Sequence, residues 1–135
     1  METVVKKNKE ILSLEEIREL VDVFYGKVRK DPILAPVFEQ RIGGKWELHL
    51  DKMYRFWQTV LLQEHTYNGS PFSPHASMPI GEAHFERWLK LFQETLKENF
   101  TGDKAEEALW RAEKMAEMFQ LKIDYYRNNS IHPLG

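Results

Sequence analysis

The chain has no cysteine among its 135 residues, and this absence removes several kinds of structure and chemistry at once. Disulfides, zinc sites with thiolate ligands and iron–sulfur clusters all require cysteine. A metal ion in this protein must therefore be held by histidine, carboxylate, tyrosine or methionine side chains. The first candidates are the five histidines, at positions 49, 65, 75, 84 and 132.

Long hydrophobic runs and a strong charge of one sign are also missing. No apolar run approaches the roughly 20 residues that span a bilayer, and the N-terminus METVVKKNKEIL lacks the features of a secretory signal. The formal net charge is only −2, so binding to nucleic acid through bulk charge is not expected. We expect a single-domain cytoplasmic protein with neither nucleic acid nor membrane as a partner.

Strand signals are absent too, because no segment alternates polar and apolar residues with period two. Apolar residues instead recur at intervals of three and four, which predicts an all-α chain with four main helices. We expect these helices at residues 14–30, 45–64, 82–100 and 104–127.

The segments between the expected helices carry clear start and stop signals. Ser13 and Glu16 have the spacing of a capping box ahead of the first helix. Residues 33–38 form a short apolar segment, and the proline-rich stretch 65–81 cannot be a long regular helix. We expect a domain at 13–128, with tails at 1–12 and 129–135.

Most histidines taken singly have an ordinary explanation. His65 lies where a helix ends, and His132 lies in the C-terminal tail. The Glu-x-x-His pairs of di-iron bundles and the H-E-x-x-H motif of zinc proteases do not occur. His49 lies on the apolar face of the second helix, where it is either a core residue or a ligand. His75 lies in a loop stiffened by prolines, where it is either exposed or aimed at a metal.

Aromatic residues are abundant, with eight Phe, five Tyr and four Trp. Many of them fall on the inner faces of the expected helices. Ordinary core packing accounts for such a stripe, and a flat apolar cofactor would account for it equally well.

An ordered set of motifs makes the chain resemble the group III truncated haemoglobins from about Ser13 to Tyr126. The motifs are Phe24-Tyr25, Pro36-Val-Phe38, Trp46-x-x-His49, Phe56-Trp57, Tyr67-Asn-Gly-Ser-Pro-Phe-Ser-Pro-His75 and His84-Phe-x-x-Trp88-Leu-x-Leu-Phe92. No single motif is diagnostic, but the set in this order is specific.

The resemblance implies a truncated globin fold, which is a two-over-two helical sandwich around haem b. It implies that His75 is the proximal ligand of the iron. It also implies that the opposite side of the haem, where the diatomic ligand binds, is lined by Tyr25, His49 and Trp88. Phe38 is implied to pack against the face of the haem.

The remaining expected cofactor contacts are apolar residues of the second and third helices. Met53 lies one helical turn after His49, so both can face the same surface. Phe56, Trp57 and Phe85 complete the expected apolar pocket. His84 and Trp88 are also one helical turn apart, so His84 can lie near the haem if Trp88 does. His84 therefore remains a rival to His75 as the ligand of the iron.

The implied function is binding of oxygen, carbon monoxide and nitric oxide at a single iron, with tight retention. Peroxidase-like or nitric-oxide-consuming redox activity, a reductase partner, and a monomeric or weakly oligomeric state are further expectations. Two alternatives stay open from the residues alone. One is a helical interaction module without a cofactor, and the other is a non-haem metal protein that uses His49, His75 and His84.

Overall fold

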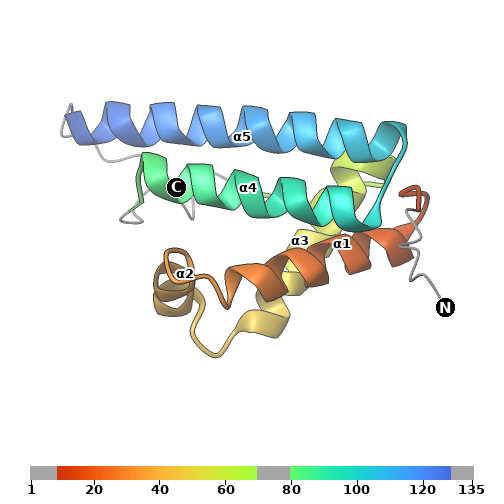
Figure 1. Cartoon of the computed structure of the whole chain (residues 1–135), viewed down its shortest axis with the longest axis horizontal. Helices are drawn as coiled ribbons and strands as arrows, with labels where there is room; N and C mark the ends of the chain where they lie inside the picture. The colour runs from red at the N-terminus through yellow and green to blue at the C-terminus, as the bar shows by residue number, and fades with distance from the viewer. Residues whose placement is uncertain (1–8, 70–79, 129–135) are drawn as a thin grey trace, which may run out of the picture.

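The computed structural model of the chain describes residues 9–69 and 80–128 (Figure 1). Within these ranges the helices are α1 (Leu14–Val28), α2 (Ala35–Ile42), α3 (Trp46–Leu62), α4 (Glu82–Asn99) and α5 (Asp103–Asn128). The four long helices confirm the all-α prediction, and their ends lie within two residues of the expected positions.

α1 begins at the expected capping signal. The carboxylate of Glu16 accepts hydrogen bonds from the backbone N–H groups of Leu12 and Ser13, at 3.1 and 2.8 Å, and from the Ser13 hydroxyl at 2.8 Å. The hydrogen bond from the Ser13 hydroxyl is the main reason why the pKa of Glu16 is lowered. The charged carboxylate also lies at the positive end of the helix dipole, which stabilises the first turn.

α2 lies where the sequence suggests only a short apolar segment. Pro36 occupies its first turn, where a missing N–H removes no intrahelical hydrogen bond. Just before the helix, the buried carboxylate of Asp31 accepts hydrogen bonds from the backbone N–H groups of Ile33 and Leu34, both at 3.0 Å. α2 ends at Gly43, whose φ of +60° suits glycine. The proline here begins a helix and does not break one.

Asp31 also connects α2 to α4, because its second carboxylate oxygen accepts a hydrogen bond from Nε of Arg87. Burial alone would raise the pKa of Asp31. The hydrogen bonds from Arg87, Leu34 and Ile33 outweigh that effect and hold the pKa below its ordinary value. The carboxylate is therefore charged at neutral pH and keeps both hydrogen-bonding roles.

The long helices form two pairs, α1 with α3 and α4 with α5, and α1 also packs against α4. In Figure 1, α4 and α5 run side by side above α1, and α3 rises steeply behind α1 and α4. Phe24 of α1 joins the pairs, with its ring centroid 5.1 Å from that of Phe92 and 5.5 Å from that of Trp88. Trp57 of α3 stacks on Phe92 at 5.3 Å. This arrangement confirms the expected two-over-two helical sandwich.

The expected N-terminal tail is described only from Lys9 onward, and this part packs on the domain. The backbone N–H of Lys9 donates to the carbonyl of Asn99 at 3.1 Å, and the N–H of Thr101 donates to the carbonyl of Lys9 at 2.9 Å. Ile11 is completely buried in the core. Residues 9–12 are thus attached to the turn between α4 and α5.

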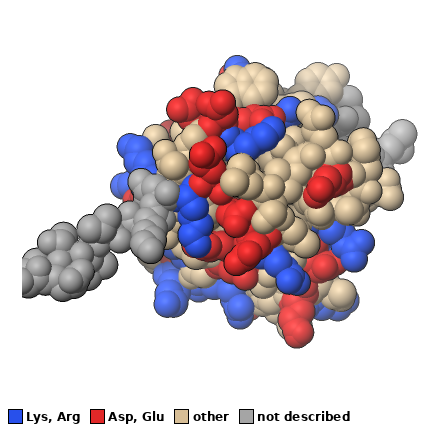
Figure 2. Space-filling view, turned by 90° about the vertical axis from the view of Figure 1, so that its right-hand side faces the viewer, with Lys and Arg blue, Asp and Glu red and all other residues tan. Residues whose placement is uncertain are grey.

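On the face that Figure 2 shows, basic and acidic side chains are interspersed, in keeping with the small formal net charge of −2. Exposed ion pairs such as Arg55–Asp51, at 2.8 Å, contribute little to stability compared with the core. No helix in the described ranges is both long and apolar enough to cross a membrane.

Candidate functional site

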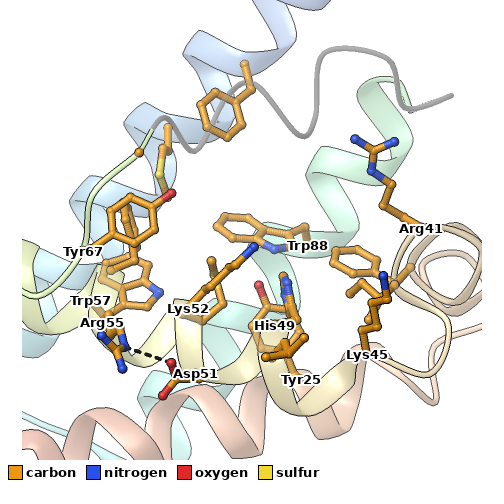
Figure 3. Close-up of a pocket in the computed structure, with 18 of the residues that line it drawn as sticks. Tyr25, Arg41, Lys45, His49, Asp51, Lys52, Arg55, Trp57, Tyr67 and Trp88 are labelled. Atoms are coloured by element: carbon orange, nitrogen blue, oxygen red, sulfur yellow. Dashed lines mark hydrogen bonds and ion pairs between the residues drawn. The ribbon is translucent and has the colours of Figure 1, made fainter. Parts of the chain in front are cut away.

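A cavity of about 910 Å³ opens among the helices. Its volume falls within the range of roughly 300–1,000 Å³ that is typical of ligand and cofactor sites. Side chains from all five helices line it, together with residues 66–69 and Ile80. Figure 3 shows this pocket with most of its lining residues.

All the predicted site residues in the described part of the chain line this one cavity. They are Tyr25, Phe38, His49, Met53, Phe56, Trp57, Phe85 and Trp88. The four from α3 share one face because they are spaced by three and four residues. The ninth predicted residue, His75, lies outside the described residues, as does His132.

Tyr25 and His49 meet at one wall of the cavity. Their ring centroids are 5.0 Å apart and their planes are perpendicular, at 90°. Tyr25 is buried, and burial raises the pKa of its phenol far above the ordinary value. The phenol therefore keeps its proton and can donate a hydrogen bond. The Nε2 atom of His49 is buried too.

Trp88 faces the cavity from α4, and packing fixes its orientation. Its indole stacks on Phe92, with centroids 5.7 Å apart and planes only 4° from parallel. Phe24 meets the indole edge-on at 5.5 Å. In Figure 3, Trp88 lies across the pocket from the backbone of α3, above Tyr25 and His49. An indole N–H donates but cannot accept, so Trp88 adds a second fixed donor group.

Tyr67 forms part of the wall beside Phe56, a role that sequence reasoning missed. The two rings meet edge-on with centroids 5.4 Å apart. The hydroxyl oxygen of Thr59 holds this stretch, because it accepts the backbone N–H groups of Thr66 at 3.1 Å and Tyr67 at 3.0 Å. These contacts between α3 and the loop hold Tyr67 at the cavity.

Basic side chains at the cavity were also missed. Arg41, Lys45, Lys52 and Arg55 all contribute to the lining, and all are exposed. Arg55 is paired with Asp51, with Nε and Oδ2 separated by 2.8 Å. Figure 3 shows Lys45 and Lys52 on either side of His49, with Arg41 beyond Lys45. The cavity thus combines apolar aromatic walls with a cationic rim formed by Arg41, Lys45 and Lys52.

One signal in the sequence pointed to this rim. Lys45, His49 and Lys52 are spaced by four and three residues, which places them along one face of α3. Basic residues next to an apolar stripe are more often solvated surface residues. Arg41 of the neighbouring α2 lies at the same cavity as these lysines, which favours a cationic rim over an ordinary solvated surface.

His84 lines the cavity as well, but its ring has another partner. Its Nδ1 atom accepts a hydrogen bond from the backbone N–H of Gly81 at 3.1 Å, just before α4 begins. A neutral imidazole that accepts at Nδ1 carries its proton on Nε2, which then has no lone pair for a metal. Among the described residues, no three His, Cys, Asp or Glu side chains are grouped to hold a metal ion.

A helical sandwich with an aromatic cavity between its helix pairs is the architecture of the globins. The profile of the family described as "Bacterial-like globin" matches residues 10–122. Group 3 truncated hemoglobin ctb from Campylobacter jejuni is 39% identical over 121 residues, covering 87% of this chain and 95% of the relative. The crystal structure of a group III truncated hemoglobin from Campylobacter jejuni superposes with a TM-score of 0.80 at 37% identity, with the same shares covered.

The chain therefore belongs to the bacterial-like globin family. Within that family, the relatives confirm the assignment to the group III truncated haemoglobins that the motifs indicated. The matched region extends from Glu10, ahead of α1, into α5 and includes every lining residue of the cavity.

Proposed function

We propose that this chain is a haem protein that binds oxygen and other diatomic ligands at a single iron. The observation that carries the proposal is the cavity of about 910 Å³, with its aromatic walls and the cationic rim of Arg41, Lys45 and Lys52. The porphyrin of haem b is a flat, apolar ring that bears carboxylates on one edge. The walls suit the ring, and the rim suits the carboxylates.

His75 is the residue that we propose as the proximal ligand. Both ends of the segment that contains it, Gly69 and Ile80, line the cavity. The rival histidine, His84, is engaged as an acceptor at the start of α4. A neutral imidazole is a suitable ligand for haem iron, so His75 would hold the iron and leave it able to bind a diatomic ligand.

Haem supplies an iron that binds oxygen, carbon monoxide and nitric oxide. The side chains of the chain decide how such a ligand is held. Tyr25 stays protonated because it is buried, so its hydroxyl is available as a donor. Trp88 offers an indole N–H, and His49 can either donate or accept. These groups favour a ligand that becomes partly negative on binding, as oxygen does.

Donors at the ligand predict slow release. A hydrogen bond to a charged group contributes roughly 1.5–3 kcal/mol, and about 1.4 kcal/mol is a factor of ten. Tyr25 and Trp88 together would slow oxygen dissociation by orders of magnitude. Tight retention suits sensing or redox chemistry better than delivery. We therefore propose peroxidase-like or nitric-oxide-consuming activity, with a reductase as electron donor.

The setting that we propose is the cytoplasm, with the protein acting as a monomer or a weak oligomer. Neither the composition nor the described residues favour another cellular compartment. Diatomic gases enter the cavity without a binding protein, so the reductase is the one macromolecular partner that the proposed chemistry requires.

An absorption spectrum of the purified or haem-reconstituted protein tests this function. A strong Soret band, which shifts on reduction and again on addition of carbon monoxide, is the expected result. A colourless protein that takes up no added haem would contradict it and would support a cofactor-free module. Bound zinc without a Soret band would support the non-haem metal protein.

A further inference from the structure

Trp46 lies behind three residues of the cavity that we call the distal wall, namely Tyr25, Phe38 and His49. The indole meets Tyr25 at a centroid distance of 6.0 Å and His49 at 5.6 Å, both edge-on, and it stacks on Phe38 at 6.4 Å. Trp46 is itself buried. One side chain thus contacts every member of the distal wall.

The far side of Trp46 is held by two charged residues. Its Nε1–H donates a hydrogen bond to Oε2 of Glu39 at 2.9 Å. The same Oε2 lies 3.7 Å from Nε of Arg29, and the Arg29 guanidinium lies over the indole, 4.5 Å from the ring centroid. An ion pair, a cation–π contact and a hydrogen bond therefore meet in one cluster, Arg29–Glu39–Trp46.

Each member of this cluster lies within four residues of a residue of the distal wall. Arg29 caps α1, and its backbone N–H donates to the carbonyl of Tyr25 at 2.9 Å. Glu39 follows Phe38 directly in α2, and Trp46 precedes His49 by one turn of α3. The cluster thus joins three helices at the point where each one contributes a residue to the wall.

We propose that the Arg29–Glu39–Trp46 cluster positions the rings of Tyr25 and His49, and that the Trp46–Glu39 hydrogen bond is the decisive contact. The proposal rests on the proposed function, in which both rings face the ligand. An indole that is held at its face and at its N–H has one orientation. A ring without the N–H is free to rotate or slide, and the distal wall moves with it.

Three substitutions separate the hydrogen bond from simple packing. Trp46→Phe keeps an aromatic ring but removes the N–H donor. Glu39→Leu removes the acceptor with little change in size, whereas Glu39→Gln keeps an acceptor oxygen and removes only the charge. Glu19→Gln is the matched control, because it disrupts an ion pair, Lys9–Glu19 at 2.8 Å, that lies outside the cluster and the cavity lining.

Two measurements report on the haem-loaded protein, and a third needs no gas ligand. The infrared C–O stretch of the carbon monoxide complex reports the polar groups beside the ligand, and stopped-flow mixing gives the oxygen dissociation rate. In the protein as purified, the nuclear Overhauser effect between the rings of Tyr25 and His49 reports their separation, which is 5.0 Å between centroids.

We expect Trp46→Phe and Glu39→Leu to shift or split the C–O band and to weaken the ring-to-ring effect. Each should speed oxygen dissociation roughly three- to tenfold, which is less than the full free energy of one charge-assisted hydrogen bond, because this bond acts on the ligand only through the rings that it positions. Glu39→Gln and Glu19→Gln should stay within twofold of the parent. The double variant with Trp46→Phe and Glu39→Leu should be no faster than the faster single variant, because both remove the same bond.

The proposal is wrong if Trp46→Phe and Glu39→Leu lower only the melting temperature and leave the C–O band, the ring-to-ring effect and the oxygen rate unchanged. It is also wrong if Glu39→Gln is as damaging as Glu39→Leu, since the hydrogen bond would then not be decisive. Failure of the proposed function looks different. In that case Tyr25→Phe leaves the oxygen rate unchanged or no Soret band forms, while the ring-to-ring effect still tests the positioning.

Discussion

The phenol of Tyr25 lies perpendicular to the imidazole of His49, with ring centroids 5.0 Å apart, at the wall of the cavity. Burial raises the pKa of Tyr25 well above its ordinary value. The hydroxyl therefore remains a donor across the neutral and mildly alkaline range, and its contribution to ligand binding should not depend on pH there.

The first prediction concerns Tyr25→Phe, which removes one oxygen atom and little volume. We expect oxygen dissociation to become about ten- to a hundredfold faster, from the roughly 1.5–3 kcal/mol of a charge-assisted hydrogen bond. Carbon monoxide, which is less polar when bound, should be affected less. Stopped-flow displacement of oxygen by carbon monoxide measures the rate.

Tyr54→Phe is the matched control for this substitution. The hydroxyl of Tyr54 donates to Asp22, on the face of α3 toward α1, and Tyr54 does not contribute to the cavity lining. Its oxygen rate should equal that of the parent. Equal rates in the parent and in Tyr25→Phe would remove Tyr25 from the proposed mechanism.

The second prediction is that Trp88 is the weaker of the two donors and is coupled to Tyr25. Trp88→Phe should speed oxygen dissociation less than Tyr25→Phe does. Because loss of one donor lets its neighbours reorient, the double variant should depart from additivity. A double-mutant cycle on the dissociation rate measures the coupling. Additive effects within about 0.3–0.5 kcal/mol would show that the two groups act independently.

The third prediction assigns the proximal ligand. His75→Ala should abolish stable haem binding, or should yield a protein that regains a normal Soret band when imidazole is added. His84→Ala should retain the spectrum, because His84 accepts the backbone N–H of Gly81 and serves α4. The reverse pattern, with the spectrum lost in His84→Ala and kept in His75→Ala, would overturn the assignment.

The fourth prediction is that haem stabilises the fold. Without it, the apolar walls formed by residues such as Phe56, Trp57 and Phe85 would face a void. A cofactor at a hundred times its Kd adds about 2.7 kcal/mol, which for a chain of this size raises the melting temperature by roughly 10 °C. Circular dichroism melts of the apo and haem-loaded forms test this. Coincident melts would contradict a buried site.

The fifth prediction concerns the ion pair between buried Asp31 and half-buried Arg87. Asp31→Asn should lower the free energy of unfolding at pH 7 by roughly 1–3 kcal/mol, the scale of hydrogen bonds to a charged group. Denaturant unfolding measures the change.

The pH dependence of this difference has a definite sign. The pKa of Asp31 is lower in the folded chain than its ordinary value, which is about 3.9 for an unfolded aspartate. The stabilisation is therefore complete above about pH 4 and is lost as the pH falls through the lower folded value. The parent and Asp31→Asn should become alike in strong acid. A difference that instead vanishes on going from pH 5 to pH 8 would show that Asp31 is not the cause.

Most of the fold was predictable because its signals are local. The capping residues Ser13 and Glu16 mark the start of α1, and the apolar spacing locates the four long helices within two residues. α2 was not predictable, since Pro36 reads as a break unless the turn that contains Asp31 is known. That turn is stabilised by Arg87, 56 positions further on.

The cavity was predictable only where a residue lies on the apolar face of a long helix. His49, Met53 and Phe56 meet that condition. Tyr67 does not, because it reaches the cavity through a hydrogen bond to Thr59 and not through any periodic pattern. The rim residue Arg41 depends in the same way on α2, so the missed helix also concealed part of the site.

The attachment of residues 9–12 to the turn after α4 has a consequence for synthesis. Lys9 leaves the ribosome before its backbone partners Asn99 and Thr101, which emerge about ninety residues later. At about 5–20 residues per second, the interval is on the order of 5–20 s. Throughout that time the backbone partners that hold Lys9 are absent, and the neighbouring Ile11, completely buried in the finished protein, lacks this attachment. Residues 9–12 are thus among the last parts of the described fold to reach their final place, although they are made before all five helices.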